Sequence, residues 1–203
     1  MNFRDPLAYH TKLYYESVRS NKMKFDFVFF NVTEYSSFEE LSFTKYVSAA
    51  HWRWNLFSRG LYGDLPRHSF ITMTESDASG SGRSEAERRQ QESVNSTLYQ
   101  VAKARMLQLA HIGIFERMEE SIELLCWTFC WKQSSIPFAY SRNNNGRDFE
   151  ITADMNSTIQ KYHNIDVQLY QDAVNEFEKR IADMRRMKEQ GFLCHLRRSC
   201  LVR

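Results

Sequence analysis

The chain has 203 residues, of which 42% are hydrophobic and 14% aromatic, which is enough for one domain with a buried core. Its 27 Lys and Arg nearly balance 25 Asp and Glu, and this balance argues against a nucleic-acid partner, since such proteins gather a basic excess on one face. No apolar run approaches the roughly 20 residues that span a bilayer, and the first residues lack the charged-then-apolar pattern of a signal peptide.

The first residues predict a strand end, a charged turn and a helix. Met1 to Phe3 have the pattern of the last residues of a strand. Pro6 suits the first position of a helix, because its missing N–H costs nothing there. A strand this short is not expected to form the edge of a complete sheet, so we expect that an element preceding it is absent from this chain.

Four segments follow before the middle of the chain. Residues 26–30 are an aromatic run that fits either a strand or a loop packed on the core, and residues 33–48 predict a helix capped by Ser36 or Ser37. Residues 51–63 mix aromatic and cationic side chains, which fit a ligand groove and an aromatic flap equally well. Residues 74–84 are small and polar, and predict a flexible surface loop that separates no domains.

The predicted fold class depends on the stretch from Leu107 to Trp131. After a predicted helix over 85–107, an apolar run from Leu107 to Phe115 predicts a buried strand. After a turn at Glu116, apolar residues recur at helical spacing. A strand that runs into a helix is half of a βα unit, so we expect an α/β fold in which helices cover a mostly parallel sheet. The apolar residues of this predicted helix are Met118, Ile122, Leu125 and Phe129.

The last third predicts a strand over 136–140, a polar loop and a long helix. The loop from Ser141 to Arg147 carries Arg142 and Arg147. Paired arginines after a parallel strand suit phosphate or sulfate oxygens, and a solvated turn is the alternative. The helix is predicted from about Asp166 to Gln190, with Gly191 ending it. Its predicted core residues are Leu169, Ala173, Phe177, Ile181 and Met184.

The cysteines and the glycosylation motifs bear on the compartment. Cys126 and Cys130 lie four apart on one helix face, which favours two buried thiols, while a disulfide between Cys194 and Cys200 stays open. Three Asn-x-Thr motifs exceed the roughly one expected by chance and mildly favour the secretory route. They begin at Asn31, Asn95 and Asn156.

No motif of a known hydrolase, zinc site or Gly-rich phosphate loop is present. The six histidines are scattered without ligand spacing. The sequence therefore assigns neither a catalytic residue nor a metal ligand.

Four segments do resemble one family. Arg4-Asp5-Pro6-Leu7, followed by two tyrosines, resembles the 3′-phosphate-binding segment of the Golgi carbohydrate sulfotransferases that use 3′-phosphoadenosine-5′-phosphosulfate (PAPS). Residues 112–125 are similar to the strand, Thr-Glu and helix of their core. Residues 59–63 match an Arg-containing, Gly-ended segment, and residues 165–181 their closing helix. The pattern is nearest to the hexuronate 2-O-sulfotransferases, with the galactose 3-O-sulfotransferases second.

The resemblance implies transfer of sulfate from PAPS to a sugar hydroxyl of a glycan or glycosaminoglycan acceptor, in the Golgi lumen or at its membrane. It implies an incomplete sulfotransferase-type P-loop fold that lacks the amino-terminal phosphate-loop half. Residues 1–203 would then be the carboxyl-terminal portion of a single domain, with a tail over 191–203.

Individual roles follow from the same resemblance. Arg4 would contact the 3′-phosphate, and Lys12 stands where the family usually has a serine. Tyr9 replaces a family arginine. Arg142 and Arg147 would belong to a late loop that closes over the nucleotide.

The family's phosphate loop and catalytic base precede the Arg-Asp-Pro turn. Since sulfuryl transfer depends on positioning donor, acceptor and base, we expect this chain alone to bind PAPS weakly and to transfer no sulfate. Two other hypotheses are a degenerate glycan- or anion-binding module of the same fold and an unrelated α/β interaction protein.

Overall fold

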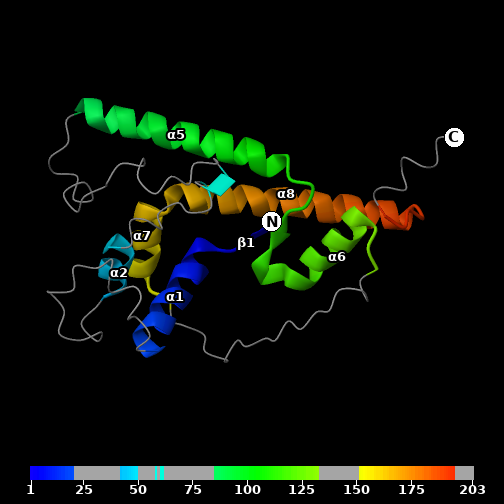
Figure 1. Cartoon of the computed structure of the whole chain (residues 1–203), viewed down its shortest axis with the longest axis horizontal. Helices are drawn as coiled ribbons and strands as arrows, with labels where there is room; N and C mark the ends of the chain where they lie inside the picture. The colour runs from blue at the N-terminus through cyan, green and yellow to red at the C-terminus, as the bar shows by residue number, and fades with distance from the viewer. Residues whose placement is uncertain (21–41, 50–57, 59, 62–84, 133–150, 195–203) are drawn as a thin grey trace. The chain divides into compact units, whose positions relative to one another are not determined.

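A computed structural model describes residues 1–20, 42–49, 58, 60–61, 85–132 and 151–194 (Figure 1). This part of the chain is mostly helical, with a small parallel sheet. The chain divides into two compact units: residues 1–5, 103–148 and 169–203 form the first, and residues 6–102 and 149–168 form the second. Helices α5 (Glu85–Leu107) and α8 (Asn164–Glu189) contribute residues to both units.

In the first unit two short strands pair in parallel. β1 (Asn2–Phe3) lies beside β2 (Gly113–Ile114), with Asn2 opposite Gly113 and Phe3 opposite Ile114. The predicted strand end at the amino terminus and the parallel direction are both confirmed. A Cβ at Gly113 would collide with the end of the Asn2 side chain, so this exposed side chain would have to move to admit a larger residue.

The predicted strand from Leu107 to Phe115 is wrong over most of its length. α5 continues through Leu107, and the next two N–H groups bond back to carbonyl oxygens in its last turn. Arg180 of α8 stabilises this turn by donating to the carbonyl oxygens of Leu107, Leu109 and Ala110. A short apolar run does not distinguish a strand from a helix end followed by a bonded turn.

A helix follows β2, as predicted. The short 3-10 helix η4 (Phe115–Arg117) leads into α6 (Met118–Phe129). The buried face differs from the predicted one: Ile122 is buried, but the Phe129 side chain is 36% exposed, while Leu124, which was not predicted, is 1% exposed. The core face of α6 is therefore turned relative to the predicted stripe.

The long carboxyl-terminal helix is the best-predicted element. α8 ends at Glu189, and Gly191 has a φ of 86°, the left-handed conformation that favours glycine. The N–H groups of Gly191 and Phe192 donate to carbonyl oxygens in the last turn of α8, which satisfies them. All five predicted core residues are at most 1% exposed: Leu169, Ala173, Phe177, Ile181 and Met184.

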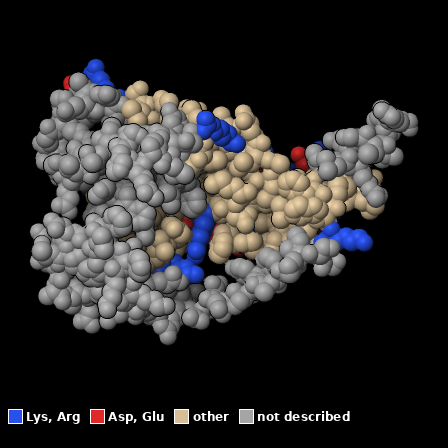
Figure 2. Space-filling view, viewed as in Figure 1, with Lys and Arg blue, Asp and Glu red and all other residues tan. Residues whose placement is uncertain are grey.

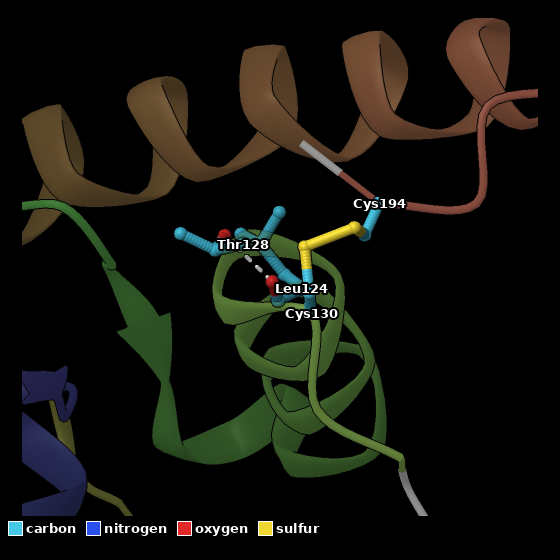
Figure 3. Close-up of a disulfide and its surroundings, with 4 residues drawn as sticks. All are labelled: Leu124, Thr128, Cys130 and Cys194. Atoms are coloured by element: carbon cyan, nitrogen blue, oxygen red, sulfur yellow. Dashed lines mark hydrogen bonds between the residues drawn. A yellow bond between two sulfur atoms is a disulfide. The ribbon is translucent and has the colours of Figure 1, made fainter. Parts of the chain in front are cut away.

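A disulfide joins the end of α6 to the segment after α8 (Figure 3). Cys130 and Cys194 are bonded, with their Cα atoms 5.2 Å apart. One expectation is thereby corrected, because Cys130 is not a free thiol. The alternative that was left open for Cys194 is also decided, since Cys194 pairs with Cys130 and not with Cys200, which lies outside the described residues. Cys126 is a buried thiol, as expected. Spacing misled because the partners are 64 residues apart and meet only through the packing of the first unit.

The second unit has an aromatic and aliphatic core between three helices, α1 (Pro6–Ser20), α2 (Phe43–Ala49) and α7 (Ala153–Tyr162). Pro6 begins α1, as predicted, and the Thr152 side chain caps α7 by accepting the Met155 N–H. The core cluster consists of Phe43, Tyr46, Val47, Met155, Ile159 and Tyr162.

The remaining predicted elements lie outside the described residues. These are the segments 26–30, 74–84 and 136–140, the beginning of the helix predicted over 33–48, and most of 51–63.

Cross-linking can be tested directly. Non-reducing peptide mapping should recover a Cys130–Cys194 cross-link, and replacing both residues by serine should lower the free energy of unfolding by about 2 to 4 kcal/mol, because the cross-link closes a long loop. Cys126→Ala is the matched control and should leave the cross-link intact. Recovery of a peptide pair joining Cys194 to Cys200 would contradict the structure.

Two buried histidines of the second unit lead us to expect that the free energy of unfolding depends on pH. The rings of His10 and His163 lie in contact at a tilt of 36°, with their centroids 3.9 Å apart, and both residues are at most 4% exposed. Burial, and then the neighbouring His10, lowers the pKa of His163 from 6.5 to about 2. Below pH 6.5 the unfolded chain therefore binds a proton at this histidine that the folded chain does not.

The free energy of unfolding should consequently fall on acidification below the unfolded pKa, by about 2 kcal/mol for His163 between neutral pH and about pH 5. Urea unfolding across this range measures the loss, and NMR of the His163 ring should show no titration there. A ring that titrates near its ordinary pKa would show that the histidine is not buried in this way.

Candidate functional site

The turns that follow the two strands lie at one edge of the sheet, because the strands are parallel. Arg4 and Asp5 follow β1, and Phe115 and Glu116 follow β2. The Asp5 N–H donates to Glu116 Oε1 over 3.1 Å, which joins the two turns directly. The carboxyl ends of parallel strands are where α/β folds bind ligands. We refer to Arg4, Asp5, Phe115, Glu116 and Tyr170 as the strand-end cluster.

Tyr170 brings α8 to the same carboxylate. Its hydroxyl donates to Glu116 Oε2 over 3.0 Å, so both carboxylate oxygens of Glu116 accept a hydrogen bond from a different element. Burial raises the pKa of Tyr170, and the charge and hydrogen bond of Glu116 and the charge of Asp5 raise it further. The hydroxyl is therefore neutral at physiological pH, and it serves as a hydrogen-bond donor and not as a base.

Arg4 is held by an aromatic ring. Its guanidinium carbon lies 4.5 Å from the centroid of the Phe115 ring, and the side chain is half-buried. Attraction between a cation and a ring face orients the planar guanidinium. A guanidinium oriented in this way offers the parallel N–H groups that bind phosphate or sulfate oxygens.

Side-chain hydrogen bonds stabilise the turn that follows β2. The Ser121 hydroxyl accepts the Ile114 N–H over 2.8 Å and lies 2.9 Å from the carbonyl oxygens of Ile114 and Arg117. Arg117 binds both carboxylate oxygens of Glu120 and also contacts Glu178 of α8. Hydrogen bonds to Glu120, and secondarily to Glu178, raise the pKa of Arg117 above its ordinary value. These bonds fix the backbone that carries Glu116.

The structure places two of the four predicted nucleotide-binding residues. Arg4 belongs to the strand-end cluster of the first unit, and Lys12 is a half-buried residue of α1 in the second unit. Arg142 and Arg147 lie outside the described residues, so their predicted role stays a prediction.

Glu116 and Tyr170 were not assigned any role from the sequence. A carboxylate directly after a buried strand was a usable signal for Glu116. Tyr170 gave none, because it is 54 residues away along the chain and joins the cluster only through α8.

Three further features of the described residues bear on function: surface charge, metal-ligand groups, and the length and apolarity of the helices. On the face drawn in Figure 2 most of the described surface is uncharged, and its basic and acidic residues occur in small separate groups. Within the described ranges, no group of His, Cys, Asp or Glu side chains could hold a metal ion. The helices of this part of the chain include none with the length and apolarity that a bilayer crossing requires.

No protein-family model matches the chain, and neither a curated protein nor a solved structure matches it. The interpretation of the strand-end cluster therefore depends on its own geometry and on the sequence motifs that form it.

Glu116 should be important for the stability of the first unit. Glu116→Ala removes the acceptor for the Asp5 N–H and the Tyr170 hydroxyl. Because Glu116 is exposed and water can replace the lost acceptor, the free energy of unfolding should fall by about 1 to 2 kcal/mol. The matched control is Glu119→Ala in the first turn of α6, an exposed residue whose loss should cost less than about 1 kcal/mol. Equal losses for both variants, measured by urea unfolding, would show that Glu116 does not join the turns.

Proposed function

We propose that this chain carries part of the nucleotide site of a PAPS-dependent carbohydrate O-sulfotransferase of the Golgi type, and that the strand-end cluster forms the side of that site that faces the 3′-phosphate. The acceptor would be a sugar hydroxyl of a glycan or glycosaminoglycan, and the fold would be of the sulfotransferase P-loop type. The observation that carries the proposal is the position of Arg4 at the carboxyl end of a parallel strand, against the Phe115 ring.

Arg4 suits the phosphate group for three reasons. A guanidinium keeps its positive charge at all physiological pH values, and its paired N–H groups match phosphate oxygens in a bidentate way. The Phe115 ring limits the orientations that the side chain can adopt, so less entropy is lost on binding. The bond between Asp5 and Glu116 fixes the backbone next to Arg4.

PAPS would supply the sulfuryl group that is transferred. In this proposal Arg4 binds the 3′-phosphate. Lys12, which stands where the family usually has a serine, remains a candidate from the sequence resemblance alone. Arg142 and Arg147 remain candidates for closing over the nucleotide from the 141–147 loop. None of these residues is assigned as the base that activates the acceptor hydroxyl.

The disulfide supports the proposed compartment. Disulfides form and persist in oxidising compartments and are rare in the cytosol. The cross-link between Cys130 and Cys194 closes a 64-residue separation within the first unit. A lumenal location, as in the Golgi, would allow this bond to form.

A second candidate function is a glycan- or anion-binding module of the same fold without catalysis. The substitutions at Lys12 and Tyr9 favour it, because they change two positions where the family usually has nucleotide-contacting residues. Genomic sequence upstream of the coding region separates the two functions. An open frame encoding a Gly-containing phosphate loop supports the enzyme, and a frame without one supports the binding module.

Nucleotide binding tests the proposal directly. An NMR titration of the chain with 3′-phosphoadenosine-5′-phosphate should give weak but saturable shifts, and adenosine 5′-phosphate, which lacks the 3′-phosphate, should bind more weakly. Arg4→Ala should weaken the bisphosphate about tenfold or more, because a hydrogen bond to a charged group is lost, and should abolish the preference between the two nucleotides.

Arg186→Ala is the matched control for this titration. Arg186 is an exposed arginine of the same unit that pairs with Asp183, and its removal should leave both affinities unchanged. The proposal is refuted if the wild-type chain shows no preference for the 3′-phosphate, or if Arg4→Ala keeps that preference.

A further inference from the structure

Two Asn-x-Thr motifs lie within the described residues, and their asparagines differ in exposure. Asn95 lies in the middle of α5, where the residue is half-buried and takes part in an interaction. Asn156 lies in the first half of α7 and is exposed. A glycan is large and hydrated, so only an asparagine on an open surface can carry one in the folded protein.

Asn156 is on the outward face of α7. The residues of this helix that pack into the core of the second unit are Met155, Ile159 and Tyr162. Ala153 and Gln160, about one turn before and after Asn156, are exposed like Asn156 itself. A substituent on the Asn156 amide would therefore extend into solvent without displacing a core residue.

The third residue of this motif, Thr158, is buried and hydrogen-bonded in the folded protein. Thr158 is 4% exposed, and its hydroxyl lies 3.1 Å from the hydroxyl of Thr44 on α2. The Thr44 hydroxyl in turn donates to Asp154 Oδ2 over 3.0 Å. Once α2 has packed on α7, the hydroxyl of the motif is buried and bonded. Any modifying enzyme that reads the motif must therefore act before this packing, while the chain enters the lumen.

We infer that Asn156 is an N-glycosylation site that is modified during synthesis. The inference goes beyond the proposed function, and it depends on the lumenal location proposed above. The donor would be an oligosaccharide carried on a polyprenol diphosphate, the class of co-reactant that this modification uses. The Asn156 Nδ2 nitrogen forms a bond to C1 of the first sugar and loses one proton. The bond from C1 to the phosphate oxygen breaks, and the lipid diphosphate leaves with the electron pair.

The experiment uses the full chain, directed into the secretory pathway of animal cells by a cleavable signal peptide. Treatment with peptide N-glycosidase should increase the gel mobility of the wild-type chain. Asn156→Gln should lose one such mobility step, while its melting temperature, measured on the deglycosylated proteins, stays unchanged because the side chain is exposed. Thr158→Ser keeps a hydroxyl and should keep the step, whereas Thr158→Val should lose it and also lower the melting temperature.

Two outcomes overturn the inference. One is an Asn156→Gln variant that keeps every mobility step of the wild type. The other is a wild-type chain that carries the Cys130–Cys194 cross-link, and so has folded in the lumen, but shows no glycosidase-sensitive step. Asn95→Gln separates the two described motifs, because it should leave the step at Asn156 in place. The nucleotide titration of unmodified chain is independent of these results, so failure here and failure of the proposed function are distinguishable.

Discussion

Parallel pairing of β1 with β2 is the constraint on which the first unit depends. Asp5 and Glu116 are 111 residues apart, so bringing the strand ends together costs about 4 kcal/mol of loop-closure entropy. The hydrogen bonds between two strands of two residues each are too few to offset that cost. Burial of Phe3 and Ile114, both at most 2% exposed, contributes about 1.5 to 3 kcal/mol each. The small sheet is therefore held by its packing, and the strand-end cluster forms because that packing brings two turns to one edge.

α8 connects this packing to the site chemistry. Its core face covers the first unit with five nearly inaccessible side chains, while Tyr170 on the same helix donates to Glu116. Arg180, further along, donates to three carbonyl oxygens of the turn that precedes β2. One helix thus positions both ends of the segment that supplies Phe115 and Glu116. A substitution that shifts α8 would therefore also move Glu116, and through the Asp5 N–H bond it would move the turn that carries Arg4.

The disulfide and the Asn156 motif lie in different units and rest on different chemistry, and the proposed lumenal location would suit both. Cys130 takes a left-handed conformation, with a φ of 57°, at the end of α6, where glycine is the usual residue. This conformation costs roughly 1 kcal/mol for a residue with a side chain. The cross-link to Cys194 accounts for a cysteine at that position, because glycine could not form it.

By itself, the sequence determined the elements whose signals are local. Pro6 and Gly191 mark helix ends through their own backbone geometry, and the spacing of Leu169, Ala173, Phe177, Ile181 and Met184 records which face of α8 is buried. The motif that contains Arg4 was equally visible. Tertiary structure alone decided that the apolar run at Leu107 ends a helix, that Cys130 pairs with Cys194, and that Tyr170 meets Glu116. Each of these outcomes joins residues far apart along the chain, and their pairing depends on how the helices pack, which no local pattern records.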